Sequence, residues 1–203
     1  MKLLLITIFL SQINFPGKVG LKRNSTEKIL IINSFNAESM KARKNKQLLF
    51  AELSDSLKQM LYNEMDAKIP VERIVIPELI ILQDNDSVYF ELIRKYSATK
   101  AIVIKNLNVY FEQTGVEVTR DGNHKDREAS YDIDADVDYD LYDESKKIRE
   151  FHTRVFEFFT TRSVVSGLLA AGPDIVGKRK HAYRIIQKNA QQFVRELKAE
   201  IEN

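Results

Sequence analysis

Aspartate recurs at every second position of one short segment. Residues 131–144 read YDIDADVDYDLYDE, and the acidic positions are Asp132, Asp134, Asp136, Asp138, Asp140 and Asp143. Hard cations such as Ca²⁺ prefer carboxylate ligands, and paired carboxylates also serve as general acids and bases. This segment is therefore the first candidate for a metal site or a catalytic centre.

The segment departs from a calcium loop of the EF-hand type. Asp132, Asp134 and Asp136 match the first, third and fifth positions of that loop. The sixth position needs glycine for a sharp turn but is Val137, and the twelfth is Asp143 in place of a bidentate glutamate. Strict alternation of aspartate with apolar residues is typical instead of a half-buried β-strand.

The next segment predicts a strand that pairs with the aspartate-rich one. A turn at residues 143–146 precedes KKIREFHTRVFEFFTTR, which is rich in the Phe, Thr and Val that strands favour. One hairpin register keeps apolar residues on one face and charged residues on the other. That register pairs Tyr139 with Phe151, Ala135 with Val155, Asp138 with His152, and Asp136 with Arg154.

Three interpretations of the aspartate-rich strand stay open. The first is a solvated strand face whose carboxylates meet basic residues of the next strand. The second is a site for Ca²⁺ or another hard cation, or for a small ligand, that uses Asp134, Asp136 and Asp138. The third is catalysis by paired carboxylates.

A second candidate site is the glycine-containing segment SGLLAAGPDIVGK, residues 166–178. Gly167 and Gly172 have the spacing of a phosphate-binding loop, but Pro173 and Asp174 follow where Lys and Ser or Thr would contact phosphate. Two roles are open for this segment: a short buried turn between the last strand and the last helix, or an exposed loop that contacts a partner protein. The expected contact residues are Gly167, Leu168, Leu169, Gly172 and Pro173.

Other catalytic patterns are missing from the sequence. The absence of cysteine excludes disulfides, thiol catalysis, cysteine-based zinc sites and lipid attachment to a cysteine. His124, His152 and His181 lie far apart, and no G-x-S-x-G motif occurs. We therefore expect a protein that is not an enzyme, with no catalytic residues and no cofactor.

The charge balance gives no support for nucleic acid as a partner. The chain has 31 basic and 29 acidic residues, for a net charge of +2. Two basic clusters occur, KARKNK at 41–46 and GKRKHAYR at 177–184, and neither is interleaved with several stacking aromatic residues. In so balanced a chain, we interpret both clusters as solvated surface.

The N-terminus has the pattern of a short secretory signal. Lys2 precedes an apolar run from Leu3 to Leu10, which is too short to span a bilayer. The alternative is an extra N-terminal strand, which would leave the protein in the cytoplasm. We therefore divide the chain into residues 1–19, a signal peptide or extra strand, and residues 20–203, a single α/β domain that is periplasmic or secreted if the signal is cleaved.

The rest of the chain alternates strands with amphipathic helices. We expect strands at 28–35, 74–76 and 101–104, and helices at 45–65, after the N-cap residues 84–87, and at 179–201. After residue 104 we expect an antiparallel meander, with a break at 113–115 and a loop at 120–128. The predicted fold class is α/β (α+β), a mixed sheet in the order β-α-β-α-β followed by the meander and a C-terminal helix.

This order, from KILIINSF at 28–35 to FVRELKAEI at 193–201, resembles a class of bacterial envelope domains. The class includes the amino-terminal domain of the Tol-system translocation protein, the curli-secretion lipoprotein and lipoprotein activators of cell-wall synthases. The hairpin DADVDYDLYDESKKIREF at 134–151 is similar to the meander hairpin of such domains. The class is mostly non-catalytic, and the resemblance implies no active-site residues. It also implies peripheral association with the envelope and a partner that is another envelope protein or a second copy.

Three functional hypotheses follow. The first is a non-enzymatic envelope or secreted domain for protein–protein interaction or assembly. The second is a domain that binds a divalent cation or small ligand through the aspartate-rich strand. The third is an intracellular nucleotide-binding or nucleic-acid-binding domain.

Overall fold

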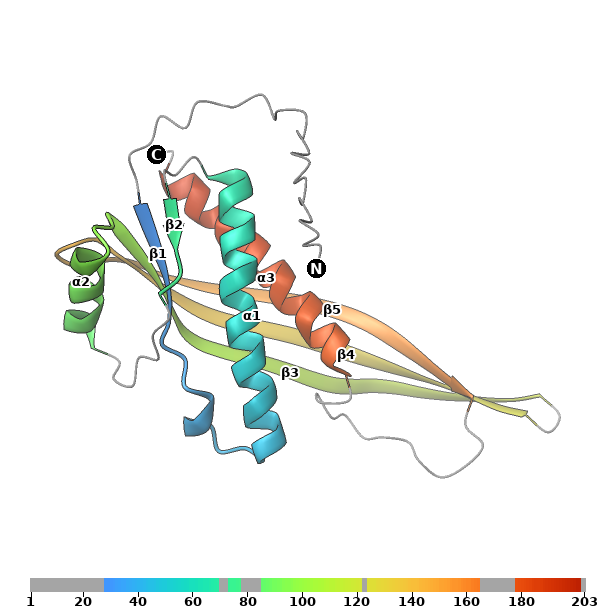
Figure 1. Cartoon of the computed structure of the whole chain (residues 1–203). Coiled ribbons are helices and arrows are strands. Elements are labelled where there is room, and N and C mark those ends of the chain that lie inside the picture. Colours follow the sequence, from blue (N-terminus) through green and yellow to red (C-terminus); the bar gives the residue numbers. More distant parts are fainter. Residues whose placement is uncertain (1–27, 70–72, 78–84, 122–123, 165–177, 202–203) are drawn as a thin grey trace, which may run out of the picture.

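The computed structural model describes residues 28–69, 73–77, 85–121, 124–164 and 178–201 (Figure 1). Within these ranges a five-stranded mixed sheet has the strand order β2-β1-β3-β4-β5. The elements along the chain are β1 (Lys28–Asn33), the short 3-10 helix η1 (Ala37–Ser39), α1 (Lys44–Lys68), β2 (Arg73–Val75), α2 (Asp86–Lys95), β3 (Lys100–Asp121), β4 (His124–Tyr142), β5 (Lys147–Val164) and α3 (Arg179–Ile201). The predicted fold class is confirmed.

The parallel half of the sheet consists of short apolar strands. β1 pairs in parallel with β2 on one side and with β3 on the other. Both faces of β1 are covered, since Ile29 and Ile31 pack in the core under α1 and α3, whereas Leu30 and Ile32 pack in a second core under α2. A continuous apolar run is the pattern expected for a parallel strand that is buried on both sides.

Figure 1 shows α1 and α3 lying across the same face of the sheet. Both helices bury one apolar stripe there, as the spacing of three and four predicts. The fully buried residues of these stripes include Leu53, Leu57, Leu61, Met65, Ile186, Ala190, Phe193 and Leu197. The helix α2 begins after Asn85, whose side chain accepts a hydrogen bond from the Ser87 backbone N–H at 3.0 Å, a typical N-cap contact.

The antiparallel half is longer and more regular than the sequence predicts. The expected break at 113–115 is wrong, because β3 continues from Lys100 to Asp121 and has only a register shift between Gln113 and Gly115. The expected loop at 120–128 is also wrong, since β3 ends at Asp121 and β4 begins at His124. Strand pairing uses backbone groups and therefore continues through a polar segment with no apolar alternation.

The hairpin of β4 and β5 has the predicted register. Tyr139 pairs with Phe151, and Asp138 pairs with His152. At the turn, the Asp143 carboxylate accepts hydrogen bonds from the backbone N–H groups of Ser145 at 2.7 Å and Lys146 at 2.8 Å. These hydrogen bonds hold the pKa of Asp143 below its usual value, because they favour the charged carboxylate.

A buried polar group fixes α3 to the sheet. The Asn189 side-chain oxygen accepts hydrogen bonds from the Tyr139 hydroxyl at 2.8 Å and the Thr153 hydroxyl at 2.7 Å. Its amide nitrogen donates to the backbone carbonyls of Thr153 at 2.9 Å and Ala135 at 3.3 Å. Because each polar atom has a partner, the network is compatible with full burial and sets the position of α3 over β4 and β5.

Two predictions fall outside the described residues. They are the signal or extra strand at 1–19 and the contact loop at 167–173. Of the helices in the described ranges, none has the combination of length and hydropathy that crossing a bilayer requires.

Candidate functional site

The long strands β3, β4 and β5 have one face that no described helix covers along most of its length. α1 and α3 occupy the opposite face, and α2 packs only near Ala101, Val103 and Tyr142. Beyond that point the alternation of side chains brings three rows to the surface. We name this surface the open face, and it consists of Asn106, Asn108, Tyr110 and Glu112 on β3, Asp132, Asp134, Asp136 and Asp138 on β4, and His152, Arg154, Phe156 and Phe158 on β5.

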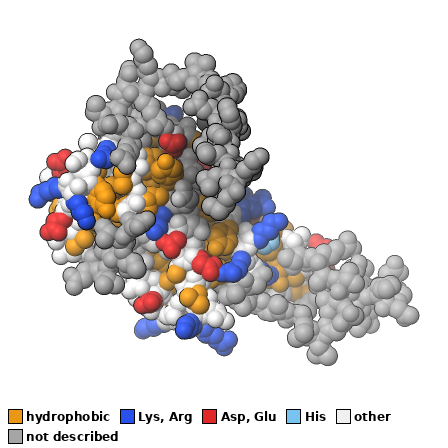
Figure 2. All heavy atoms as spheres, viewed as in Figure 1, with side chains coloured by type: hydrophobic (Ala, Val, Ile, Leu, Met, Phe, Trp, Pro, Cys, Tyr) orange, Lys and Arg blue, Asp and Glu red, His pale blue; other side chains and the backbone are white. Residues whose placement is uncertain are grey.

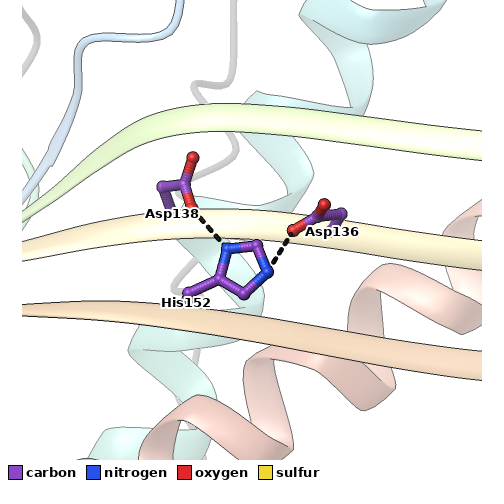
Figure 3. Close-up of side chains that lie close together, drawn as sticks. All are labelled: Asp136, Asp138 and His152. Carbon is purple, nitrogen blue, oxygen red and sulfur yellow. Dashed lines mark hydrogen bonds and ion pairs between the residues drawn. The ribbon is translucent and has the colours of Figure 1, made fainter.

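The imidazole of His152 lies between two carboxylates of the neighbouring strand (Figure 3). Its Nδ1 is 2.7 Å from Oδ1 of Asp138, and its Nε2 is 3.3 Å from Oδ1 of Asp136. Asn106 also donates a hydrogen bond to Asp138, at 3.2 Å. The hydrogen bond to Asp138 and the charge of Asp136 raise the pKa of His152 above its usual value, because a protonated ring can donate from both nitrogens.

Arg154 reaches a different aspartate from the one directly opposite. The backbone register pairs it with Asp136, as predicted, but its Nε donates to Oδ2 of Asp134 at 2.6 Å and its Nη2 contacts the same oxygen. A diagonal neighbour across a strand pair is within reach of a long side chain. Because His152 contacts Asp136, each of the three central aspartates meets a basic partner.

One group on the open face has side chains suited to a divalent cation. The ligand atoms of Asp136, Asp138 and His152 all lie within 4.8 Å of one another. The predicted trio named Asp134 in place of His152, and in the structure Asp134 pairs with Arg154. Zn²⁺ accepts imidazole nitrogen and carboxylate oxygen as ligands, but here the two carboxylates contact different ring nitrogens (Figure 3). A metal ion would therefore have to displace a proton and one of these contacts.

Three aromatic side chains stand on the open face among the charges. Tyr110 is 58% exposed, Phe156 is 60% exposed and Phe158 is 55% exposed. Tyr110 and Phe156 lie in one row across the strands, on either side of Asp134. The sequence analysis did not identify these residues as a site. The signal that could have found them is alternation along β5, which places Phe151 and Phe159 in the core and Phe156 and Phe158 outside it.

The two basic clusters lie away from the open face, one before and at the start of α1 and the other at the start of α3. Figure 2 shows Lys and Arg side chains gathered at one end of the molecule. Lys41, Arg43 and Lys44, at the start of α1, are exposed. The Lys46 ammonium lies 5.6 Å from the centre of the Phe50 ring, which is buried. In the second cluster Arg179 pairs with Glu52, and Arg184 pairs with Glu157 at 2.8 Å.

The three histidines are not brought together into one site. His181 on α3 stacks on Phe159, with ring centres 3.7 Å apart, and burial lowers its pKa. His124 is the first residue of β4. Both nitrogens of His152 contact carboxylates, so neither is oriented toward a hydroxyl nucleophile. The predicted contact residues 167–173 lie outside the described part of the chain, between β5 and α3.

Comparison with known proteins adds structural neighbours but no family. No protein-family model matches the chain, and no curated protein matches its sequence. The similar solved structures include a minor lipoprotein from Acinetobacter baumannii, 11% identical, which aligns over 86% of this chain and 94% of that one with a TM-score of 0.42. A putative neuraminyllactose-binding hemagglutinin homolog from Helicobacter pylori is 15% identical over 90% and 89% of the two chains, with a TM-score of 0.48. Rare lipoprotein B from Shewanella oneidensis is 9% identical over 87% and 100%, with a TM-score of 0.41. At these values the likeness carries no argument about function.

Proposed function

We propose that the chain is a non-enzymatic envelope or secreted domain that binds another protein through its open face. The observation that carries this proposal is the exposure of Tyr110, Phe156 and Phe158 on a sheet face that no described helix covers. Aromatic residues and arginine are enriched at the centres of protein interfaces. Arg154, itself exposed, lies beside Phe156 in the same surface.

The energetics favour a partner over simple exposure to water. Burying a Phe side chain fully is worth about 1.5–3 kcal/mol relative to exposure. These three rings are more than half exposed while the rings of Phe151 and Phe159 on the other face of β5 are buried. A partner that covered the open face would bury these three rings, and this burial would contribute to the free energy of binding.

The open face also suits a protein partner because hydrogen-bonded strands hold its side chains in place. The three strands that carry it are joined by antiparallel pairing, with β3 and β5 on either side of the central strand β4. Several of its polar groups are held by contacts across the strands, such as His152 with Asp138. Side chains that are already ordered lose little conformational entropy when a partner binds.

The proposed location follows from the N-terminus. The run from Leu3 to Leu10 behind Lys2 supports export through a cleaved signal. N-terminal sequencing of the protein made in its native host tests this part, and cleavage between about Ser11 and Val19 is the expected result. An intact Met1 would contradict it.

The binding part of the proposal can be tested with a surface variant. Phe156→Ser/Phe158→Ser is compared with the control Leu48→Ser, which removes a side chain 54% exposed on α1. In extracts of the native host, we expect the wild type and the control to elute in a complex larger than the 23.5 kDa chain. The double variant should elute as the free chain, and a complex of unchanged size in that variant would contradict the proposal.

The second candidate function is binding of a divalent cation, which the proximity of Asp136, Asp138 and His152 favours. Calorimetric titration with Zn²⁺ and with Ca²⁺ tests it, with Asp138→Asn as the variant and Glu38→Gln as the control. The second candidate predicts heat of binding that is lost in Asp138→Asn alone. No heat with either ion, or equal heat in all three proteins, would exclude it.

A further inference from the structure

On the open face, carboxylate side chains outnumber basic side chains. Its carboxylates are Glu112, Asp132, Asp134, Asp136 and Asp138, and its basic groups are Arg154 and His152. Surface carboxylates near α1 and α3 have basic partners instead, such as Glu52 with Arg179, Glu157 with Arg184 and Lys188, and Glu200 with Arg149. The excess of negative charge is therefore a property of this surface rather than of the whole chain, whose net charge is +2.

Some carboxylates of the open face have no hydrogen-bond partner among the described residues. Among the described residues, none forms an ion pair or hydrogen bond with the side chain of Glu112 or Asp132. Asp134 is different, because its Oδ2 accepts from Arg154 and its Oδ1, although without a hydrogen-bond partner in the described structure, is buried and out of reach of a docking partner. A partner that brings donors to this surface would satisfy acceptors that the fold leaves unused.

The exposed rings occupy positions suited to cations. Tyr110 and Phe156 flank Asp134, and Phe158 lies opposite Asp132 on the neighbouring strand. A Lys or Arg side chain above such a ring gains a cation–π contact while its charged end meets the carboxylate. Alternate residues of a strand lie about 6.5 Å apart, so the aspartate row repeats at the spacing of alternate side chains in any extended segment.

We infer that the occupant of the open face is an extended segment of another protein with Lys or Arg side chains at alternate positions. This inference rests on the proposed protein-binding function and specifies the chemistry of the partner. Charge complementarity favours this occupant, because the open face has five carboxylates and only two basic groups, and this net negative excess attracts basic side chains and repels phosphate. The same excess of carboxylates disfavours nucleic acid and anionic membrane surfaces as occupants of this face.

A labelled peptide provides the probe. We would titrate the protein into a fluorescein-labelled octapeptide of alternating Lys and Thr, and into a matched octapeptide of alternating Glu and Thr, and follow fluorescence anisotropy. The Lys peptide should bind and the Glu peptide should not. Binding should weaken several-fold between about 20 mM and 300 mM NaCl, because salt screens exposed charges.

A charge-neutralising variant locates the site. Glu112→Gln/Asp132→Asn removes two carboxylates without described partners. It should weaken binding of the Lys peptide by about threefold to thirtyfold, the combined effect of two exposed pairs that each contribute a few tenths to one kcal/mol. The control Glu38→Gln/Glu91→Gln removes two exposed carboxylates of η1 and α2 and should leave the affinity unchanged.

Three outcomes would overturn the inference. One is failure of the Lys peptide to bind, and another is equal weakening by the two double variants. The third is the finding that the purified protein forms a homo-oligomer and that either open-face double variant dissociates it. That result would assign the open face to a second copy of the chain. If Phe156→Ser/Phe158→Ser abolishes the complex in host extracts while the Lys peptide does not bind, the protein-binding proposal stands and only the cationic partner is wrong.

Discussion

The two faces of the β3–β5 sheet are built from the same strands but differ in how their polar groups are satisfied. On the covered face the Asn189 side chain satisfies the hydroxyls of Tyr139 and Thr153, and the buried Lys178 ammonium, which has no hydrogen-bond partner in the described structure, lies over the Tyr131 ring. On the open face carboxylates outnumber basic groups, and rings such as Phe156 are exposed. The comparison indicates that the covered face provides the stability of the fold, whereas the open face is available for recognition.

The largest difference between the faces should appear when a ring is removed. Phe193 on α3 is fully buried and stacks on Tyr139 with ring centres 4.1 Å apart. We expect Phe193→Ala to lower the free energy of unfolding by about 3–5 kcal/mol, the cost of a large cavity. Phe158→Ala, on the open face, should change it by less than about 0.5 kcal/mol. Urea unfolding measures both, and equal losses would contradict the division between the faces.

A smaller difference should appear when an asparagine is replaced. Asn189→Leu leaves the hydroxyls of Tyr139 and Thr153 and two carbonyls without their buried partner. The loss should be about 1–3 kcal/mol, the cost of unsatisfied buried polar groups. The matched change Asn108→Leu lies on the open face and should stay within about 0.5 kcal/mol of the wild type. A stable Asn189→Leu variant would show that the network does not position α3.

The smallest difference concerns the pKa values of two histidines. The carboxylates of Asp138 and Asp136 raise the pKa of His152, whereas burial lowers that of His181. In an NMR titration of the ring protons, we expect His152 to titrate above about 6.5 and His181 below it. Asp138→Asn should lower the pKa of His152 and leave that of His181 unchanged. The reverse order of the two pKa values in the wild type would contradict the described contacts.

The two histidines should affect stability with opposite signs. A raised folded-state pKa means that the His152 contacts stabilise the fold below about pH 6.5 and lose this effect as pH rises through the folded-state value. His181 has a lowered pKa, so its contribution is present above about pH 6.5 and decreases as pH falls. Because His152 is exposed, we expect its effect on the free energy of unfolding to be only a few tenths of a kcal/mol.

Alternation in the sequence predicted much of the fold and of the open face. The period of two along the aspartate-rich strand identified β4, and the charges of His152 and Arg154 identified its register with β5. The same pattern could not predict that β3 continues through Gln113 and Gly115, because backbone pairing tolerates polar residues. It also could not predict that Arg154 reaches Asp134, since a flexible side chain chooses among several neighbours.

The extent of α2 was a further limit of sequence reasoning. Strand alternation shows that Phe156 and Phe158 share a face with the aspartates, but it does not show whether a helix covers that face. In the structure, α2 packs against Tyr142 and Val103 near one end of the sheet. The aromatic residues farther along the strands therefore stay exposed, which is a tertiary property that no local pattern contains.

Site-specific photo-crosslinking in the native host tests directly whether another protein binds the open face. A benzophenone amino acid would replace Phe156, and in a matched control it would replace Leu48, a side chain of similar exposure on α1. We expect one discrete protein adduct at position 156 and none at position 48. No adduct at position 156, or the same adduct at both positions, would contradict the assignment of the open face as the binding surface.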